Sequence, residues 1–215
     1  MANNAGSSKE RILASAAELF AEKGFTETSV RQLAEVVGMN AASLYYHFPS
    51  KISILDHMME DYSIFNTDVF KDKDISGLLR KNPNTDGILS CLSLAFPAER
   101  REYYIKVLCV LLQEQLRNPD VRAYVSESII LVAEENIKTI IDELKRIGTL
   151  REDTDPDYWM KIHSSLLYSF ANRLLLGIGD NAPGFSGMDM EGMLRHTFDM
   201  MLETCGTEKH PEAGP

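Results

Sequence analysis

Two helix start signals and one helix stop signal fall close together within residues 28–51. Ser29 and Gln32 form a capping box, in which each partner satisfies a backbone N–H group that a helix end leaves unpaired. Gly38 follows the last apolar residue of that helix, where glycine readily adopts the left-handed conformation that ends helices. Asn40 then caps a second helix after a single residue. This spacing leaves room only for a sharp turn, and it predicts a helix-turn-helix rather than a parallel hairpin.

The second of these helices has an apolar side and a small, hydroxyl-bearing side. At about 100° per residue, inward placement of Leu44 also buries Phe48 and turns the opposite side to solvent. That outward side consists of Ala42, Ser43, Tyr45 and Tyr46. Such a surface is typical of a recognition helix, whose first residues reach base edges while hydroxyls and cations contact phosphates. The segment therefore predicts DNA binding.

The expected contacts differ with side-chain chemistry. The methyl groups of Ala41 and Ala42 allow a close approach to the groove floor or contact with a thymine methyl group. The polar candidates divide into hydrogen-bonding side chains, Asn40 and Ser43, and phosphate-binding side chains, Tyr45, Tyr46 and Lys51. Arg31, in the first turn of the preceding helix, suits either a phosphate or a guanine.

These residues resemble the N-terminal DNA-binding domain of TetR-type bacterial transcriptional repressors. The similarity runs through residues 9–25, 28–34 and 44–51, including the run Leu44-Tyr45-Tyr46-His47-Phe48. It implies a dimer whose third helix enters the major groove and whose fourth helix joins the reading head to a ligand-binding body. The chain departs from many members of that family at Ala41 and Ala42, where they carry a basic residue and a glycine.

Carried over by position, the resemblance gives ten candidate DNA-binding residues. They are Ser29, Arg31, Asn40, Ala41, Ala42, Ser43, Tyr45, Tyr46, His47 and Lys51. For Tyr45, Tyr46 and His47 the alternative is packing between helices, and His47, which points half inward on the helical wheel, favours packing.

The chain is acidic, with a formal net charge of −10. Residues 1–60 hold five Lys and Arg against seven Asp and Glu, a net of −2, so most of the acidic excess lies beyond them. A head that is not basic predicts few phosphate contacts per protomer, a shallow salt dependence and a reliance on dimerisation for affinity.

The rest of the chain predicts an all-α fold, with a three-helix helix-turn-helix head and a larger helical ligand-binding and dimerisation body. We expect a DNA-binding domain at residues 1–52, with 1–6 disordered, a body at 53–205 and a disordered tail at 206–215. Helices are expected at about 7–24 and 51–65, then at about 98–117, 119–147, 156–178 and 188–205, with a short helix and loops in 71–87.

The helices at 156–178 and 188–205 are apolar around more of their circumference than one core can cover. The excess predicts a homodimer through the last two helices, joined as a four-helix bundle. Three cysteines without a CxxC pair, no apolar leader and no run of 18 apolar residues predict a reduced, cytoplasmic protein without a membrane span.

A ligand pocket is expected where a few polar groups lie on an apolar wall. The candidates are Tyr103, Tyr104, Cys109 and Gln113 on one helix and Trp159, His163 and Phe170 on another. For His163 the alternative is a hydrogen-bonded histidine within the dimer interface. Met193, His196 and Met200 share a helix face, but methionine at helical spacing usually fills cores, so neither a metal nor a cofactor is expected.

No phosphate loop, nucleophile elbow or HExxH motif is present, so an enzyme is not expected. The sequence favours a ligand-responsive repressor that binds a palindromic operator as a dimer and leaves it when a small-molecule effector binds. The alternative is a helix-turn-helix regulator whose body docks a protein partner instead.

Overall fold

The structure, a computed structural model, describes residues 7–66, 69–94, 100–175 and 190–207. The described chain is helical, and its only β pairing is one isolated bridge between Leu150 and Gly206. The predicted all-α fold is therefore confirmed. None of the described helices is long and apolar enough to cross a bilayer. The chain divides into two compact units, residues 1–67 with 96–129 and residues 68–95 with 130–215.

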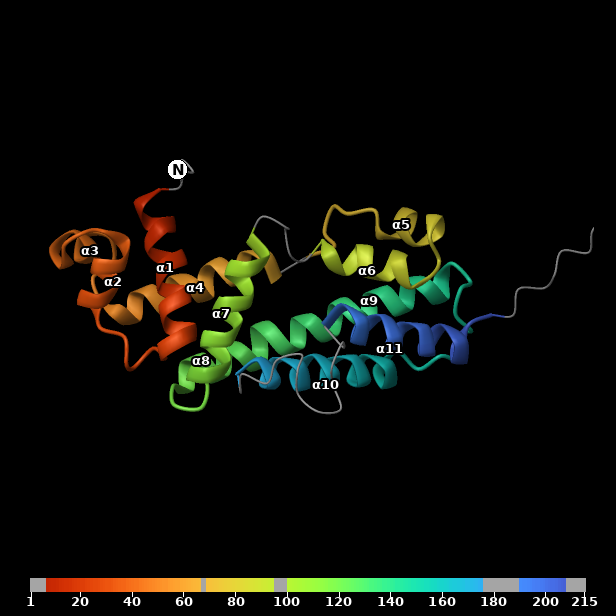
Figure 1. Ribbon diagram of the computed structural model, residues 1–215. Coiled ribbons are helices and arrows are strands. Elements are labelled where there is room, and N and C mark those ends of the chain that lie inside the picture. Colours follow the sequence, from red (N-terminus) through yellow and green to blue (C-terminus); the bar gives the residue numbers. More distant parts are fainter. Residues whose placement is uncertain (1–6, 67–68, 95–99, 176–189, 208–215) are drawn as a thin grey trace, which may run out of the picture. The chain divides into compact units, whose positions relative to one another are not determined.

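The first unit is built around its first helix (Figure 1). Its helices are α1 (Ser8–Lys23), α2 (Val30–Val37), α3 (Ala41–His47), α4 (Lys51–Asn66), α7 (Arg101–Glu114) and α8 (Pro119–Tyr124). Helix α1 packs against α2, α3, α4 and α7. Ile12 and Phe20 of α1 are fully buried, as are Leu44 and Phe48 around α3 and Leu55 of α4.

The capping signals of the head act as the sequence predicts. Ser7 and Glu10 form a capping box at the start of α1, and Ser29 and Gln32 form one at the start of α2. Gly38 ends α2 with a left-handed φ of 75°, a conformation that costs glycine little. The Asn40 side chain then accepts a hydrogen bond from the Ser43 backbone N–H at 2.8 Å, which starts α3.

The second unit packs its described helices around a separate core (Figure 1). They are α5 (Ile75–Lys81), α6 (Thr85–Ser93), α9 (Leu131–Arg146), α10 (Pro156–Leu175) and α11 (Met190–Cys205). Helix α9 packs against α5, α6 and α10, and α11 packs against α6 and α10. Ile140, Ile141, Leu144, Phe198 and Met201 lie fully buried at the centre of this unit.

The helices differ from the expectation in two places. The segment 71–87 was expected to hold one short helix, but two helices, α5 and α6, begin within it because Asp74 and Asn84 each cap a helix start. The helix expected at 119–147 is present without a break from Pro119 to Arg146, but its middle, Val125–Ile130, is π-helical and separates α8 from α9. A π-helix has no distinctive residue pattern, so helical periodicity alone does not reveal it.

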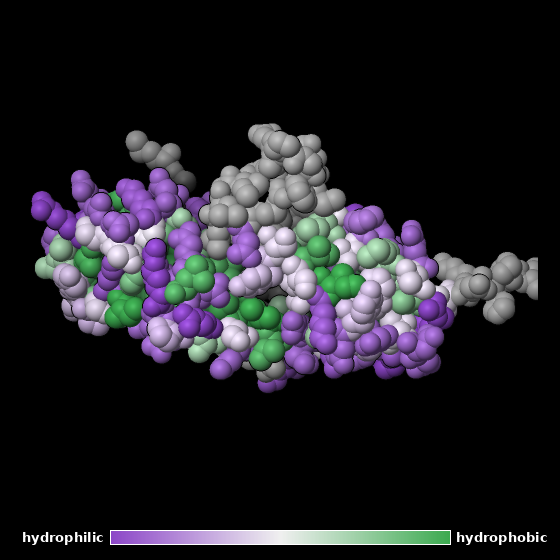
Figure 2. Space-filling view, turned by 90° about the horizontal axis from the view of Figure 1, so that it is seen from below, coloured by the Kyte–Doolittle hydropathy of each residue, from purple (hydrophilic) through white to green (hydrophobic). Residues whose placement is uncertain are grey.

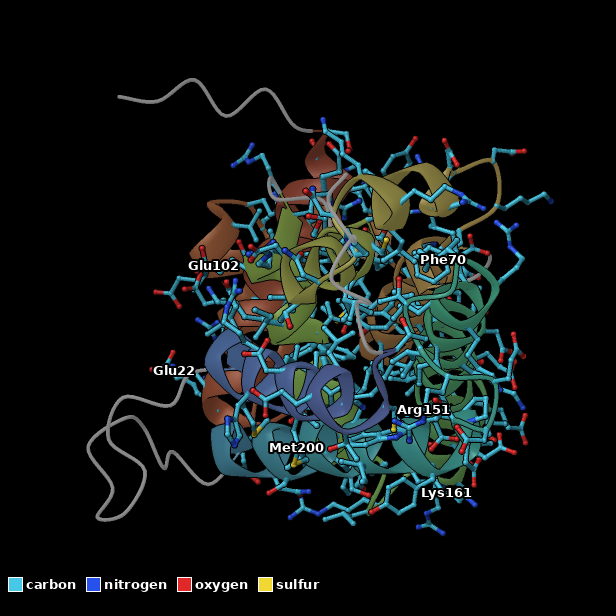
Figure 3. All side chains as sticks on the ribbon, turned by 90° about the vertical axis from the view of Figure 1, so that its right-hand side faces the viewer. Glu22, Phe70, Glu102, Arg151, Lys161 and Met200 are labelled. Atoms are coloured by element: carbon cyan, nitrogen blue, oxygen red, sulfur yellow. The ribbon has the colours of Figure 1, made fainter. Side chains whose placement is uncertain are left out.

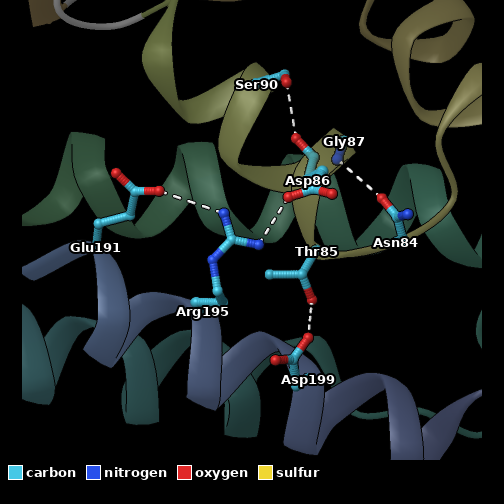
Figure 4. Close-up of polar contacts among 8 residues, drawn as sticks. All are labelled: Asn84, Thr85, Asp86, Gly87, Ser90, Glu191, Arg195 and Asp199. Carbon is cyan, nitrogen blue, oxygen red and sulfur yellow. Dashed lines mark hydrogen bonds and ion pairs between the residues drawn. The ribbon is translucent and has the colours of Figure 1, made fainter.

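Polar side chains fasten α11 to α6 at the surface of the second unit (Figure 4). Arg195 pairs with Asp86 of α6 at 2.7 Å and with Glu191 of its own helix at 3.2 Å. The buried Thr85 hydroxyl donates a hydrogen bond to the Asp199 carboxylate. These contacts set the position of α11 against α6 beyond what the apolar core alone specifies.

His163 of α10 lies in the core of the second unit and has no exposed surface. Its Nδ1–H donates to the Trp159 carbonyl oxygen, 2.7 Å away, and its ring stacks on Phe198 with centroids 4.0 Å apart. Its Nε2 atom is buried and has no hydrogen-bond partner among the residues that the structure describes. Burial lowers the pKa of His163, and the bond to Trp159 opposes this only in part, so the ring is held neutral.

This burial predicts a pH-dependent stability. The unfolded chain takes up a proton at His163 near pH 6.5, whereas the folded chain does so only at lower pH. The free energy of unfolding should therefore fall as pH drops below about 6.5, by at most ~1.4 kcal/mol per pH unit from this group. Urea unfolding between pH 7.5 and 5.5, followed by the fluorescence of the single tryptophan, Trp159, measures it.

Replacing the histidine should flatten this dependence. His163→Asn keeps a donor near the Trp159 carbonyl but does not titrate, so its unfolding free energy should vary less with pH. His196→Asn, at an exposed position of α11, should keep the wild-type dependence. Equal pH dependence in His163→Asn and the wild type would contradict the prediction.

Candidate DNA-binding surface

Helix α3 presents its predicted outward side to solvent. Leu44 and the C-cap residue Phe48 are fully buried, whereas Tyr46 is 87 % exposed and Tyr45 about half exposed. Ala42 and Ser43 are also exposed, and Ala41 is half-buried. A helix of seven residues thus has a fixed inner side and an outer side that carries methyl and hydroxyl groups.

The candidates on and beside α2 are exposed as well. The Ser29 hydroxyl is engaged in the capping box, where it lies 2.8 Å from Gln32 Oε1 and 3.2 Å from the Gln32 backbone nitrogen. Asn40 uses its side-chain oxygen to cap α3, so its amide NH₂ group remains available for another acceptor. Arg31 is exposed, and within the described ranges its side chain makes neither a hydrogen bond nor an ion pair.

His47 is half-buried beside the most exposed tyrosine. Its ring meets the Tyr46 ring edge to face, with centroids 5.5 Å apart and planes at 80°. Because both residues lie on α3, this contact restricts the directions in which the Tyr46 ring can point, and it does not test packing of His47 between helices.

Lys51 lies at the start of α4, but its ammonium group faces protein atoms. Nζ donates to the carbonyl oxygens of Phe25 at 2.7 Å, Thr28 at 2.9 Å and Thr26 at 3.3 Å. It also lies 4.5 Å from the centroid of the Phe25 ring. A lysine has three N–H donors, and here each has an acceptor in the loop between α1 and α2. The geometry thus links α4 to that loop.

Two further basic residues of the head bind the protein itself. Lys9 of α1 reaches His57 of α4, with Nζ 2.8 Å from Nε2, while His57 Nδ1 donates to the Ser53 carbonyl oxygen. Arg11 donates to the Val37 carbonyl oxygen at 3.1 Å. Sequence reasoning missed these roles because the partners lie 26 to 48 positions away and follow no periodic pattern.

Because several basic side chains bind the head itself, few of them remain available to bind a partner. Of its five basic residues, Lys9, Arg11 and Lys51 bind the head itself. Arg31 and Lys23 are the exposed ones for which the described part of the chain shows no bonded partner. To bind another molecule, such a surface has hydroxyl, amide and backbone donors available more than charged groups.

The ligand candidates fall into two groups. In the first unit, Tyr103 and Tyr104 lie at the start of α7, close to Arg100 and Asp61. Burial and the Asp61 carboxylate raise the pKa of both hydroxyls, which keeps them neutral. Burial also raises the pKa of Cys109, and the Gln113 side chain donates to the Ala21 carbonyl oxygen at 3.4 Å.

The other group lies in the second unit. Trp159 donates its indole N–H to the Cys205 sulfur at 3.3 Å, and His163 lies beside it in the core described above. The side chain of Phe170 lies outside the described residues. Among the side chains that are described, no three His, Cys, Asp or Glu residues are grouped so as to hold a metal ion.

Comparison with known proteins places the head in a family. Residues 12–58 match the family model described as "Bacterial regulatory proteins, tetR family". The chain is 38 % identical over 56 residues to the probable HTH-type transcriptional regulator YttP of Bacillus subtilis, 26 % of this chain and 27 % of that protein. It is 41 % identical over 54 residues to the repressor KstR2 of Rhodococcus jostii, 25 % and 26 % of the two chains. The chain thus spans about a quarter of the length of these relatives.

Solved structures extend the likeness of fold along the chain. The ketosteroid transcriptional regulator KstR2 of Mycobacterium tuberculosis superposes with a TM-score of 0.62 and 19 % identity, over 96 % of this chain and 99 % of that one. A putative transcriptional regulator of Saccharomonospora viridis, in complex with choline, gives a TM-score of 0.63 and 21 % identity over 91 % and 95 %. Residues 12–58 therefore match the N-terminal domain of the tetR family of bacterial regulatory proteins, and the chain has the fold of these solved regulators.

Proposed function

We propose that this protein regulates transcription by binding a palindromic DNA operator as a homodimer, with one α3 helix of each protomer in the major groove. The observation that carries the proposal is the outer side of α3, where Tyr46 is 87 % exposed while Leu44 and Phe48 behind it are fully buried. A short helix held this way offers base-edge contacts at its first turn and phosphate contacts at its end.

Each candidate then has a proposed role. Ala41 and Ala42 contact thymine methyl groups or the groove floor, Asn40 and Ser43 donate hydrogen bonds, and Tyr45 and Tyr46 reach flanking phosphates. Arg31 binds a phosphate or a guanine, and Ser29 adds a hydroxyl near the backbone. His47 supports Tyr46, consistent with the contact between their rings. Lys51 holds α4 against the loop between α1 and α2.

A dimer is supported by apolar side chains left exposed on the last two helices. Tyr168 of α10 and Met200 of α11 are each 41 % exposed, and Met200 lies on the side of α11 next to α10 (Figure 3). The face drawn in Figure 2 also carries apolar patches between its hydrophilic side chains. In a two-fold dimer the two α3 helices would read half-sites about 34–36 Å apart.

Repression and release by a small molecule complete the proposal. KstR2 of Rhodococcus jostii and IcaR of Staphylococcus aureus, the latter 42 % identical over 52 residues, are both named as negative regulators of transcription. The Saccharomonospora viridis structure holds choline. An effector that binds the DNA-free geometry more tightly must weaken DNA binding by the same factor as DNA weakens effector binding.

Selection of bound duplexes from a random DNA pool tests the function directly. The purified full chain at about 0.15 M salt should recover a palindrome, and sedimentation at micromolar concentration should show a dimer. Recovery of no motif would overturn sequence-specific DNA binding and favour a protein partner.

Two substitutions in α3 should separate phosphate contacts from base contacts. Tyr46→Phe removes one hydroxyl per protomer and should weaken binding to operator and random DNA alike, by about tenfold for the dimer. Ala42→Leu should mainly change the preferred sequence in a repeated selection. Tyr158→Phe, at an exposed position outside the head, is the control and should bind as the wild type does. Equal effects of both variants on operator and random DNA would contradict these roles.

The salt dependence of binding tests the role of Lys51. Lys51→Met removes the three carbonyl contacts and should weaken operator binding while leaving the slope of log K against log[salt] unchanged, since no phosphate contact is lost. Arg31→Gln should reduce that slope by about 0.9 per lost phosphate contact, or about 1.8 for a dimer. A comparable loss of slope in Lys51→Met would show that the ammonium group binds phosphate instead.

A further inference from the structure

The contact between Lys9 and His57 fixes where the histidine carries its hydrogen. His57 Nδ1 lies 2.8 Å from the Ser53 carbonyl oxygen, which only accepts, so Nδ1 is protonated and donates. Lys9 Nζ lies 2.8 Å from His57 Nε2, and an ammonium group only donates, so Nε2 accepts and carries no hydrogen. The arrangement therefore requires a neutral imidazole in its Nδ1–H form.

A second proton on His57 would break this contact. The imidazolium ion carries a hydrogen on both nitrogens, so Nε2 has no lone pair left for the lysine ammonium group. The two positive charges would then repel each other, and the exposed Lys9 side chain would turn to solvent. Histidine is the side chain that ordinarily changes its charge between pH 5 and 8. A fall in pH is therefore the change that releases Lys9.

Lys9 differs in this respect from the two other cations that bind the head itself. Arg11 and Lys51 donate to backbone carbonyl oxygens, which do not titrate. Of these three basic residues, Lys9 alone has a titratable acceptor. The number of cations that the head offers to a partner thus depends on the charge of His57.

The elements beside α4 bring different groups to it. Helix α1 contributes the Lys9 ammonium group to His57, and the end of α3 contributes the uncharged ring of Phe48. On α4 itself, the carboxylates of Glu60 and Asp61 follow three and four positions after His57. The contacts from other helices fall at least one turn beyond His57, and they are Arg100 with Asp61 and Tyr124 with Ser63. Among the described contacts, Lys9 is therefore the charged group that meets the His57 ring.

The pair of Lys9 and His57 lies at the end of the candidate recognition helix. Lys9 Nζ is 5.4 Å from the centroid of the Phe48 ring, and the His57 ring meets that ring edge to face at 5.1 Å. Phe48 is the C-cap residue of α3 and follows Tyr46 by two positions. The proposed phosphate contacts are made at this end of α3, and a lysine has a long flexible side chain with which to reach a phosphate there.

We propose that Lys9 is a further phosphate contact of the head and that His57 controls it. Neutral His57 holds the Lys9 ammonium group on the protein, and protonated His57 releases it to a DNA phosphate beside the end of α3. The phosphate contact rests on the proposed function, whereas the pairing of the two side chains requires no DNA. Because DNA then favours the protonated form, a proton is taken up on binding and the affinity rises as pH falls.

The position of the hydrogen on His57 tests the pairing without DNA. In the full chain labelled with ¹⁵N-histidine, long-range ¹H–¹⁵N NMR correlations at pH 8 should show the neutral Nδ1–H form for the signal that His57→Gln removes. The Nε2–H form at that pH would exclude a hydrogen bond from Lys9 to this ring and would overturn the proposal, whatever the DNA result.

The salt dependence of DNA binding at two pH values tests the release. For the wild-type chain, the slope of log K against log[salt] should be steeper at pH 5.5 than at pH 8, by about 0.9 per gained phosphate contact or about 1.8 for a dimer. The difference should be the same for the selected operator and for random duplex, because phosphates carry no sequence information. Circular dichroism verifies that the chain is folded at both pH values.

Three substitutions assign the effect to these two residues. His57→Gln keeps an acceptor for Lys9 but does not titrate, so its salt slope should be the same at both pH values. Lys9→Met should also lose the difference, while its slope at pH 8 should equal that of the wild type. Lys23→Met removes the same charge from an exposed position at the opposite end of α1 and should keep the wild-type difference between the two pH values.

Other outcomes would overturn the proposal. A lower slope for Lys9→Met already at pH 8 would show that Lys9 binds phosphate while His57 is neutral. A pH difference that persists in His57→Gln would belong to another titrating group, such as His47. If no duplex binds at either pH, the phosphate contact fails together with the proposed function, while the NMR measurement still decides whether Lys9 pairs with neutral His57.

Discussion

Burial of Leu44 and Phe48 is the constraint on which the candidate DNA-binding surface depends. Helix α3 has seven residues, and a helix that short does not persist in water by itself. Both side chains are fully buried, so tertiary packing supplies the stability that local hydrogen bonds do not. Because the inner side is fixed, the direction of Ala42, Tyr45 and Tyr46 is fixed as well. A substitution on the outer side thus changes the exposed chemistry of α3, whereas a substitution on the inner side disturbs the packing that holds the helix.

The second theme is the use of charge inside the head. Lys51 and Arg11 bind backbone carbonyl oxygens, and Lys9 binds His57, so these cations connect helices instead of facing a partner. Carbonyl groups at helix ends and in loops need donors, and long basic side chains reach them from a distance. The same head is acidic overall. With few basic side chains free, this head has little electrostatic attraction for an anionic partner, so the shape of its surface and its hydrogen-bonding groups matter more.

The sequence predicts what is local and misses what is distant. Capping boxes at Ser7 and Ser29, the stop at Gly38 and the inward side of α3 are confirmed, because each signal spans at most four or five positions. The same reasoning chose Tyr103 and Tyr104 as ligand candidates but not Arg100 with Asp61, which lie 39 positions apart. The π-helix at Val125–Ile130 escaped because its residues also fit an α-helix. Pairings across the fold become visible only when the helices are placed in space.

The scarcity of free cations in the head has a consequence for how such a protein would search a genome. Non-specific attraction to DNA comes almost entirely from phosphate neutralisation, and in this head Arg31 and Lys23 are the exposed basic side chains for which the described residues show no bonded partner. Bulk chromosomal DNA would then be a weak trap, and a large share of the molecules would remain in solution between encounters. For the proposed dimer, occupancy of an operator would follow the concentration of assembled dimer, so a modest change in the amount of protein would produce a steeper change in occupancy.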